Sequence, residues 1–81
     1  MRATVLVRPK TGILDPQGAA VRSSLRHLGF DVGDARVGRL IDLEVDESDA
    51  VRARERIDAM CRQLLANPLI ECYEIELREH A

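Results

Sequence analysis

Aromatic residues are nearly absent from this chain of 81 residues, which has one Phe, one Tyr and no Trp. Phe30 and Tyr73 are too few to form the stacking platforms on which single-stranded nucleic acids bind. Basic residues do not outnumber acidic ones, since 12 Lys and Arg stand against 14 Asp and Glu, for a net charge of −2. A nucleic-acid-binding protein, which needs a strongly basic face, is therefore not expected.

Long apolar runs and cysteine clusters are also missing. No stretch approaches the roughly 18 apolar residues of a membrane span, and the segment after Met1 enters a strand pattern without the apolar core of a signal peptide. Cys61 and Cys72 lack the C-x-x-C spacing of zinc and redox motifs. We expect no membrane association and a reducing, cytoplasmic location.

Catalytic motifs are equally scarce. The five glycines form neither a G-x-G-x-x-G nor a Walker pattern, and His27 and His80 have no neighbour that would orient them as bases. Cys61 falls on the apolar stripe of a predicted helix, where a thiol is buried and unreactive, and Cys72 is predicted to pack at an interface. We predict no catalytic, cofactor-binding or metal-binding residue in this chain.

A chain of this length forms one domain, here residues 1–81, and buries only about 60 to 65% of the surface that its unfolded chain exposes. So small a core is marginal unless disulfides, metals or partners add to its stability. Because neither a disulfide framework nor a metal cluster is expected, association would supply the difference. We therefore predict a homo-oligomer, either a dimer or a tetramer, formed through the sheet.

Alternating hydrophobicity predicts three strands. Residues 3–9 and 70–78 each alternate apolar and polar side chains. Between them, residues 34–45 keep their apolar side chains at odd positions on both sides of Gly38 and Arg39. A two-residue hairpin at that point would mix the two faces, so we favour one long strand bent at Gly38.

Two amphipathic helices are predicted between the strands. Asp15 caps the first, which ends at Gly29, and Asp46 or Ser48 caps the second, which runs to about Ala66. The apolar stripe of the first helix comprises Ala20, Val21, Ser24, Leu25 and Leu28. That of the second comprises Ala50, Ala53, Ile57, Met60, Cys61, Leu64 and Leu65. Both stripes are expected to be buried.

Asn67 and Pro68 are predicted to end the second helix. Asn67 can take the left-handed conformation of a C-cap, and Pro68 cannot continue a helix. The resulting order is β-α-β-α-β, which predicts an α+β fold. We expect a two-layer sandwich in which both helices cover one face of a small, mainly antiparallel sheet with a long bent middle strand.

The first turn of the first helix contains residues that a helix does not need. Gln17 and Gly18 follow the cap, and a glycine there costs about 0.5 to 1 kcal/mol relative to alanine. A close approach by the backbone of a partner would explain the glycine. The alternative is an ordinary helix cap made by Asp15.

Several stretches occur in an order that resembles a known family. They are Arg8-Pro9-Lys10, the run from Gly12 to Gly18 with its Leu-Asp-Pro-Gln-Gly, Leu28-Gly29-Phe30, Arg36-Val37-Gly38-Arg39, and the run from Met60 to Tyr73 with its Leu-Leu-Ala-Asn. Over nearly the whole chain, they resemble the PurS family, the small subunit of phosphoribosylformylglycinamidine synthase. Cys72 and Arg39 depart from the family's usual pattern, which has an acidic residue and a lysine there.

The resemblance implies a step of purine biosynthesis in which ATP and glutamine convert formylglycinamide ribonucleotide to the amidine. In proteins similar to this one, a large synthetase subunit carries out the reaction that uses ATP and Mg, and a glutaminase subunit supplies ammonia through a transient passage. The small subunit bridges the two enzymes and binds no cofactor alone. The resemblance therefore implies a non-catalytic subunit of a cytoplasmic C–N ligase.

The surface that would contact the two larger subunits is predicted from the helix start, the bend and the second motif. Its residues are Asp15, Gln17, Gly18, Arg39, Asn67, Glu71 and Tyr73. The alternative function is a ferredoxin-like or ACT-like regulatory domain, which would have a β-α-β-β-α-β order and bind a ligand between two chains. A stand-alone enzyme is a third candidate.

Overall fold

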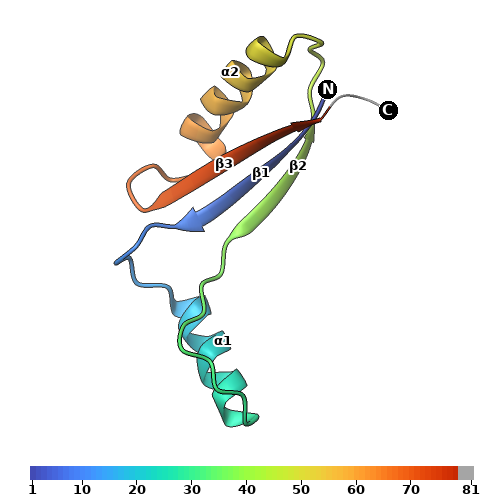
Figure 1. Cartoon of the computed structure of the whole chain (residues 1–81). Helices are drawn as coiled ribbons and strands as arrows, with labels where there is room; N and C mark the ends of the chain where they lie inside the picture. The colour runs from blue at the N-terminus through green and yellow to red at the C-terminus, as the bar shows by residue number, and fades with distance from the viewer. Residues whose placement is uncertain (79–81) are drawn as a thin grey trace.

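The computed structural model describes residues 1–78 and contains three strands and two helices (Figure 1). The elements are β1 (Arg2–Pro9), α1 (Pro16–His27), β2 (Arg39–Glu44), α2 (Ala50–Met60), the short π-helical segment η1 (Cys61–Leu65) and β3 (Glu71–Arg78). The strands pair antiparallel in the order β2-β1-β3. The predicted α+β class and the order β-α-β-α-β are confirmed.

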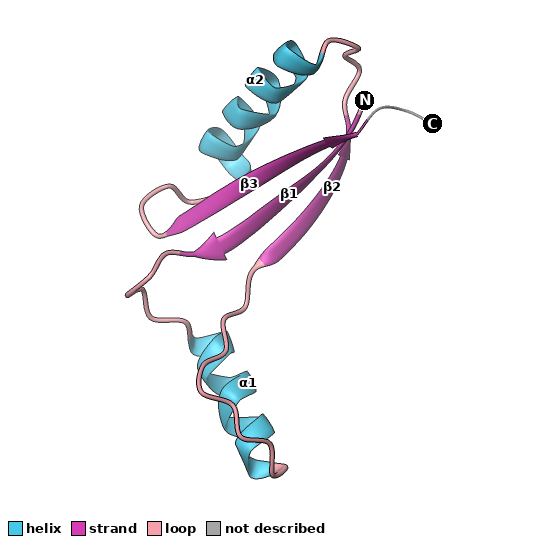
Figure 2. Ribbon diagram, viewed as in Figure 1, coloured by secondary structure: helices cyan, strands magenta, loops and turns pink. Residues whose placement is uncertain are grey.

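One face of the sheet carries the hydrophobic core. Val5 of β1 lies between Ile41 of β2 and Ile75 of β3, so odd-numbered residues share this face. α2 lies along it beside β3, and η1 continues the same layer (Figure 2). The buried hydrophobic residues are Ala3, Val5, Val7, Val45, Ala53, Ile57, Cys61 and Ala66.

The even-numbered face of the sheet is mainly polar, although Leu6 and Leu40 lie opposite each other on it and Leu40 is 60% exposed. Thr4, only 5% exposed, donates from Oγ1 to Asp42 Oδ1 at 2.9 Å and accepts from Arg78 Nη2. Arg8 and Glu74 form an exposed ion pair at 3.0 Å on the same face. These cross-strand contacts satisfy polar groups without a second layer.

The prediction that both helices cover the sheet is wrong for α1. The segment of residues 11–38, which we call the arm, extends from one end of the sheet, and only α2 lies against the sheet (Figure 1). The radius of gyration is accordingly 15.9 Å, against about 12 Å for a compact chain of this length. The stripe predicted to be buried on α1 is therefore open, with Val21 43% and Leu28 71% exposed.

The middle strand is shorter than predicted. β2 begins only at Arg39, and residues 34–38 run as extended chain alongside α1. A Cβ on Gly38 would lie 2.2 Å from the backbone oxygen of Val7, so only glycine can enter the sheet there. No hairpin forms between Gly38 and Arg39, and the β-α-β-β-α-β order of the alternative regulatory domain is wrong.

The second helix also differs in its ends. Asp49, rather than Asp46 or Ser48, is the N-cap, and its Oδ1 accepts from Val51 N at 3.0 Å. Asn67 does not take the left-handed conformation, because every positive φ among residues 1–78 belongs to a glycine. Its Oδ1 instead accepts from Leu69 N at 3.1 Å in an Asx turn.

A π turn changes which side chains are buried beyond α2. Ala66 N donates to Cys61 O at 3.0 Å, five residues back, and so closes a turn wider than that of an α-helix. Because the turn is wider, Leu65 and Ala66 are the residues of this segment that pack toward the core. Leu64, predicted to be buried, is 83% exposed.

Candidate functional site

Asp15 joins the start of α1 to the chain that returns from it. Its Oδ1 accepts from Gly18 N at 3.0 Å, which confirms the predicted N-cap, and its Oδ2 accepts from Val37 N at 2.8 Å. These two backbone hydrogen bonds, the one from Val37 first, hold the pKa of Asp15 below its ordinary value. The carboxylate therefore fixes residue 37 just before the chain enters β2.

The close approach at Gly18 comes from the chain itself. A Cβ there would lie 2.2 Å from the backbone oxygen of Ala35, in the extended segment beside α1. Gly18 is buried, whereas the neighbouring Gln17 is exposed. The need for glycine is thus explained within the arm, and Gln17 is the residue of this turn that a partner could touch.

Arg39 and Glu71 form the central contact of a second cluster. Arg39 donates from Nη1 and Nη2 to both carboxylate oxygens of Glu71, at 2.9 and 3.0 Å, across β1. Its Nη2 also donates to Leu65 O, at 2.7 Å, and so caps the end of η1. Arg39 therefore ties the first residues of β2 and β3 to the end of the helical layer.

Glu71 also organises the loop before β3. Its Oε1 accepts from Asn67 N at 2.8 Å, and Glu71 N donates back to Asn67 O at 2.7 Å. The hydrogen bonds from Arg39 first, and then the one from Asn67, lower the pKa of Glu71. The predicted residues Arg39, Asn67 and Glu71 thus meet in one cluster, and a charged carboxylate holds it together.

Tyr73 lies outside this cluster. Its hydroxyl donates to Asp58 Oδ1 of α2, and this hydrogen bond, reinforced by burial, raises the pKa of the Tyr73 hydroxyl. Cys72, its neighbour in sequence, lies on the opposite face with its Sγ 3.6 Å from Arg8 O. The side chain of Tyr73 therefore fastens β3 to α2, a partner that sequence reasoning did not identify.

The two clusters are close together in the fold. We call the region that contains them the waist, meaning residues 10–18, 36–39 and 65–71, where the base of the arm joins the sheet. Lys10 links the loop before α1 to the loop before β3, since its N donates to Ile70 O at 2.9 Å and its Nζ to Pro68 O at 2.7 Å. Sequence reasoning gathered most of these residues but missed Lys10.

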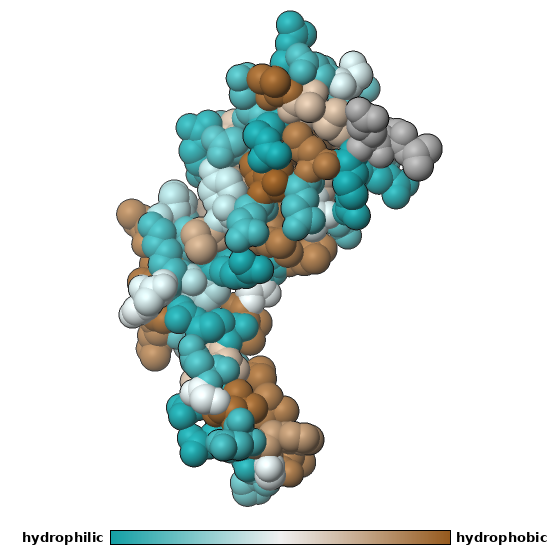
Figure 3. Space-filling model, viewed as in Figure 1, coloured by the Kyte–Doolittle hydropathy of each residue, from teal (hydrophilic) through white to brown (hydrophobic). Residues whose placement is uncertain are grey.

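Exposed leucines accompany the polar residues of the waist. Leu14 is 84% exposed and Leu69 is 82% exposed, in the two loops that Lys10 joins. Apolar side chains also gather on one side of the arm (Figure 3). Because large apolar side chains in such number usually mark contact surfaces, the waist and the arm are the candidate interfaces of this chain.

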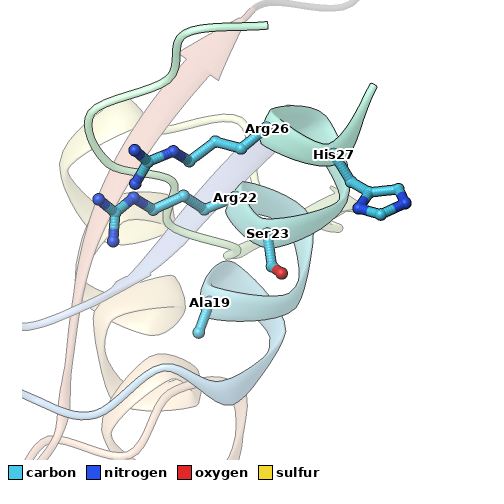
Figure 4. Close-up of a pocket in the computed structure, with 5 residues that line it drawn as sticks. All are labelled: Ala19, Arg22, Ser23, Arg26 and His27. Carbon is cyan, nitrogen blue, oxygen red and sulfur yellow. The ribbon is translucent and has the colours of Figure 1, made fainter. Parts of the chain in front are cut away.

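A basic hollow lies on the side of α1 from which Arg22 donates to Val32 O, at 3.5 Å, in the chain that returns from the helix. It has a volume of about 510 Å³ and is lined by Ala19, Arg22, Ser23, Arg26 and His27. Arg22 and Arg26 extend side by side, while His27 points to the other side (Figure 4). The residues of the hollow are exposed, as expected for a solvated helix face.

Within residues 1–78, thiol chemistry would depend on the cysteines and metal binding on clusters of ligating side chains. Cys61 is fully buried, and its burial raises the pKa of the thiol, which makes it a poor nucleophile. No group of three or more His, Cys, Asp or Glu within residues 1–78 could hold a metal ion. No helix in that range is long and apolar enough to cross a membrane. His80 lies outside the described residues.

Similar proteins are found over the whole chain. A PurS subunit of phosphoribosylformylglycinamidine synthase from Synechocystis is 45% identical over 83 aligned residues, which cover 99% of this chain and 81% of that protein. The crystal structure of Methanocaldococcus jannaschii PurS has a TM-score of 0.87 at 34% identity, with 99% and 98% of the two chains covered. In the structure of PurLQS from Thermotoga maritima, one chain has a TM-score of 0.84 at 32% identity, with 93% of each chain covered.

The sequence model of one family matches nearly the full length of the chain. Its description is PurS, phosphoribosylformylglycinamidine (FGAM) synthase, and the match spans residues 2–79. The Synechocystis relative carries the same family name, and the solved structures given above share this fold. The chain therefore belongs to the PurS family.

Proposed function

We propose that this chain is the small subunit of phosphoribosylformylglycinamidine synthase in purine biosynthesis, and that it bridges a large synthetase subunit and a glutaminase subunit. Its full-length similarity to PurS proteins, including a chain of the Thermotoga PurLQS structure, carries the proposal. The synthetase uses ATP and Mg²⁺, and the glutaminase supplies it with ammonia. This chain works in the cytoplasm and supplies contact surfaces instead of reacting groups.

The waist is the surface that we assign to the larger subunits. Gln17 and Asn67 are exposed there, and the side chain of Arg39 is 52% exposed although it binds Glu71. The intramolecular clusters fix the loops that carry Leu14 and Leu69, so a partner meets surfaces that are already ordered. Such preorganisation lowers the entropic cost of binding.

A homodimer with exchanged arms would complete the fold. The core face of β2 is only partly covered, because α2 lies beside β3 and α1 lies away from the sheet. The exposed stripe of α1 from a second copy has the apolar surface that this face lacks. We therefore infer a dimer in which α1 of each copy covers β2 of the other copy. Two helices would then cover each sheet, and the chain would associate, as the sequence predicts.

The outer edge of β2 supports this arrangement. Val45 N donates to Met1 O at 2.8 Å, in register with the β1–β2 pairs, so odd-numbered residues make the hydrogen-bonded pairs. The backbone groups of Leu40 and Asp42 then point away from β1. The extended segment of residues 31–37 from a second copy could pair with them as a fourth strand.

Reconstitution tests the bridging function. The chain, the synthetase and the glutaminase from one organism are purified separately, and glutamine-dependent amidine formation is measured with and without the chain. We expect activity with glutamine to require the chain, while activity with added ammonia requires only the synthetase. Full glutamine-dependent activity without the chain would refute the proposal.

A double substitution tests the waist. Gln17→Ala with Arg39→Ala should weaken assembly with the larger subunits, as measured by co-purification. The circular dichroism spectrum of the variant should remain that of the folded chain. The matched control is Ser48→Ala with Arg52→Ala, which changes the start of α2, the end of that helix away from the waist. Unchanged assembly and activity of the first variant would exclude the waist as the contact surface.

A further inference from the structure

β3 is an edge strand whose outer backbone groups are open. Lys10 N donates to Ile70 O at 2.9 Å in the register of the β1–β3 pairs, so even-numbered residues make the hydrogen-bonded pairs. The backbone N–H and C=O groups of Tyr73, Ile75 and Leu77 therefore point away from β1. Within residues 1–78, no strand pairs with this side of β3.

A side chain already occupies one of these open groups. Arg54 of α2 donates from Nη1 to Ile75 O at 3.3 Å, which agrees with the outward direction of that carbonyl. The hydrogen bond is long and exposed, so little stability is lost when Arg54 swings away. A backbone N–H from another chain could then take its place.

A groove runs between this edge and α2. It has a volume of about 990 Å³, and its lining includes Val51 and Arg54 of α2 and Tyr73, Ile75 and Leu77 of β3. Val51 is 66% exposed there, and Ile75 and Leu77 are half-buried. Apolar side chains lie between polar ones where α2 and β3 meet in the space-filling view (Figure 3). Alternate side chains of an added strand would enter this apolar groove.

The other face of the edge carries Glu74 and Glu76, and Glu74 already pairs with Arg8 at 3.0 Å. Glu74 and Glu76 lie on the even-numbered face of β3, directly beside the position of an added strand, and both are exposed. The side chains of that strand that do not enter the groove would lie next to them. Lysine or arginine at those positions would be favoured by charge, and acidic residues would be disfavoured.

A second copy of β3 is disfavoured at this edge in the symmetric register centred on Ile75. A symmetric antiparallel pair centred on Ile75 would set the Glu74 and Glu76 side chains of the two copies against each other. The exchanged-arm dimer uses the edge of β2 instead, and so leaves β3 free. The occupant indicated by the charges is a different chain.

We propose that the groove between α2 and the free edge of β3 binds an extended segment of a partner subunit as an added strand. The apolar side chains of that segment lie on Val51 and Leu77, and its basic side chains lie against Glu74 and Glu76. The identity of the partner as a synthetase or glutaminase subunit rests on the proposed function, whereas the groove and its preference for alternating apolar and basic residues do not.

Residue-resolved hydrogen exchange of the isolated, full-length chain tests the groove. The probe is a capped ten-residue peptide of alternating Val and Lys, and the control peptide has the same composition with its lysines in one block. The alternating peptide should slow exchange of the Tyr73, Ile75 and Leu77 amides about tenfold. The amides of Glu74 and Glu76, already bonded to β1, should not change. Equal exchange with and without this peptide would refute the proposal.

The same measurement on the assembled complex tests the partner. The odd-numbered amides of β3 should be slower in the complex than in the free chain, and Val51→Lys should reverse much of that protection and weaken assembly. Ser48→Lys adds the same charge outside the groove and serves as the control. A complex that assembles without this protection would exclude a partner strand while leaving the bridging function intact, and a concentration-dependent protection of the chain alone would assign the edge to a second copy.

Discussion

At the scale of single residues, Asp15 shows which contacts the sequence predicts and which it does not. Its role as N-cap follows from residues next to it, because the acceptor for Gly18 N lies three residues away. Its second hydrogen bond joins Val37, 22 residues away, and no local pattern predicts such a partner. The same limit applies to Gly18, because no local pattern identifies Ala35 as the residue whose close approach requires the glycine.

Replacing Gly18 by alanine should destabilise the arm. The new Cβ would lie 2.2 Å from Ala35 O, so the extended segment must move. We expect Gly18→Ala to lower the free energy of unfolding by about 1 to 3 kcal/mol, measured by urea denaturation at fixed protein concentration. Gly33→Ala is the matched control, because a Cβ at Gly33 meets nothing within 4 Å. Equal effects of the two changes would show that the arm does not hold this contact.

The pH dependence of stability should report the cluster of Arg39 and Glu71. Because the pKa of Glu71 is lowered in the folded chain, its contribution is present above its unfolded pKa of about 4.3 and is lost as pH falls through the folded value. Glu71→Gln should therefore cost about 1 kcal/mol at pH 7, and the difference from the original chain should shrink below about pH 4.

Denaturation of the two proteins from pH 7 to pH 3 checks this expectation. The control is Glu74→Gln, which removes the exposed ion pair with Arg8 and should change the free energy of unfolding by less than about 0.5 kcal/mol. If the difference in free energy of unfolding between Glu71→Gln and the original chain persisted at pH 3, the loss would come from the altered shape of the side chain and not from its charge.

At the scale of elements, periodicity predicted what depends on neighbouring residues. The bounds of β1 and β3, the start of α1 and the start of α2 each follow from local alternation or a cap, and they agree with the structure within a few residues. The placement of α1 does not follow, because the sequence shows an apolar stripe but not which surface covers it. The predicted stripe on η1 failed for a similar reason, since a π turn leaves no local signature.

The π turn makes a specific prediction for two adjacent leucines. Leu65 packs against the core, whereas Leu64 is 83% exposed. Leu65→Ala should therefore lower the free energy of unfolding by about 1 to 2 kcal/mol, and Leu64→Ala should change it by less than about 0.5 kcal/mol. Urea denaturation at one protein concentration compares them. A larger cost at Leu64 would indicate a regular α-helix through residue 65.

At the scale of the whole molecule, the shape of the chain favours the proposed association. The chain extends over 48 × 30 × 14 Å, and the arm adds length without adding to the core of the sheet. The eight buried hydrophobic residues found within residues 1–78 are few for an independent domain. Covering the stripe of α1 would bury apolar surface at about 25 cal/mol per Å² and so stabilise both copies.

Substitutions on that stripe test the exchanged-arm dimer. Val21→Asp with Leu28→Asp would place two carboxylates where the stripe meets β2 of the other copy, and burying them without partners is unfavourable. We expect the original chain to be a dimer by sedimentation equilibrium and this variant to dissociate to monomers at the same concentration, with faster amide exchange throughout α1 because the helix loses its cover. Val51→Asp, at an apolar site on α2 that is 66% exposed, should leave the dimer unchanged. A chain that is monomeric before substitution, or a dimer that withstands both aspartates, would mean that the arm serves the larger subunits alone.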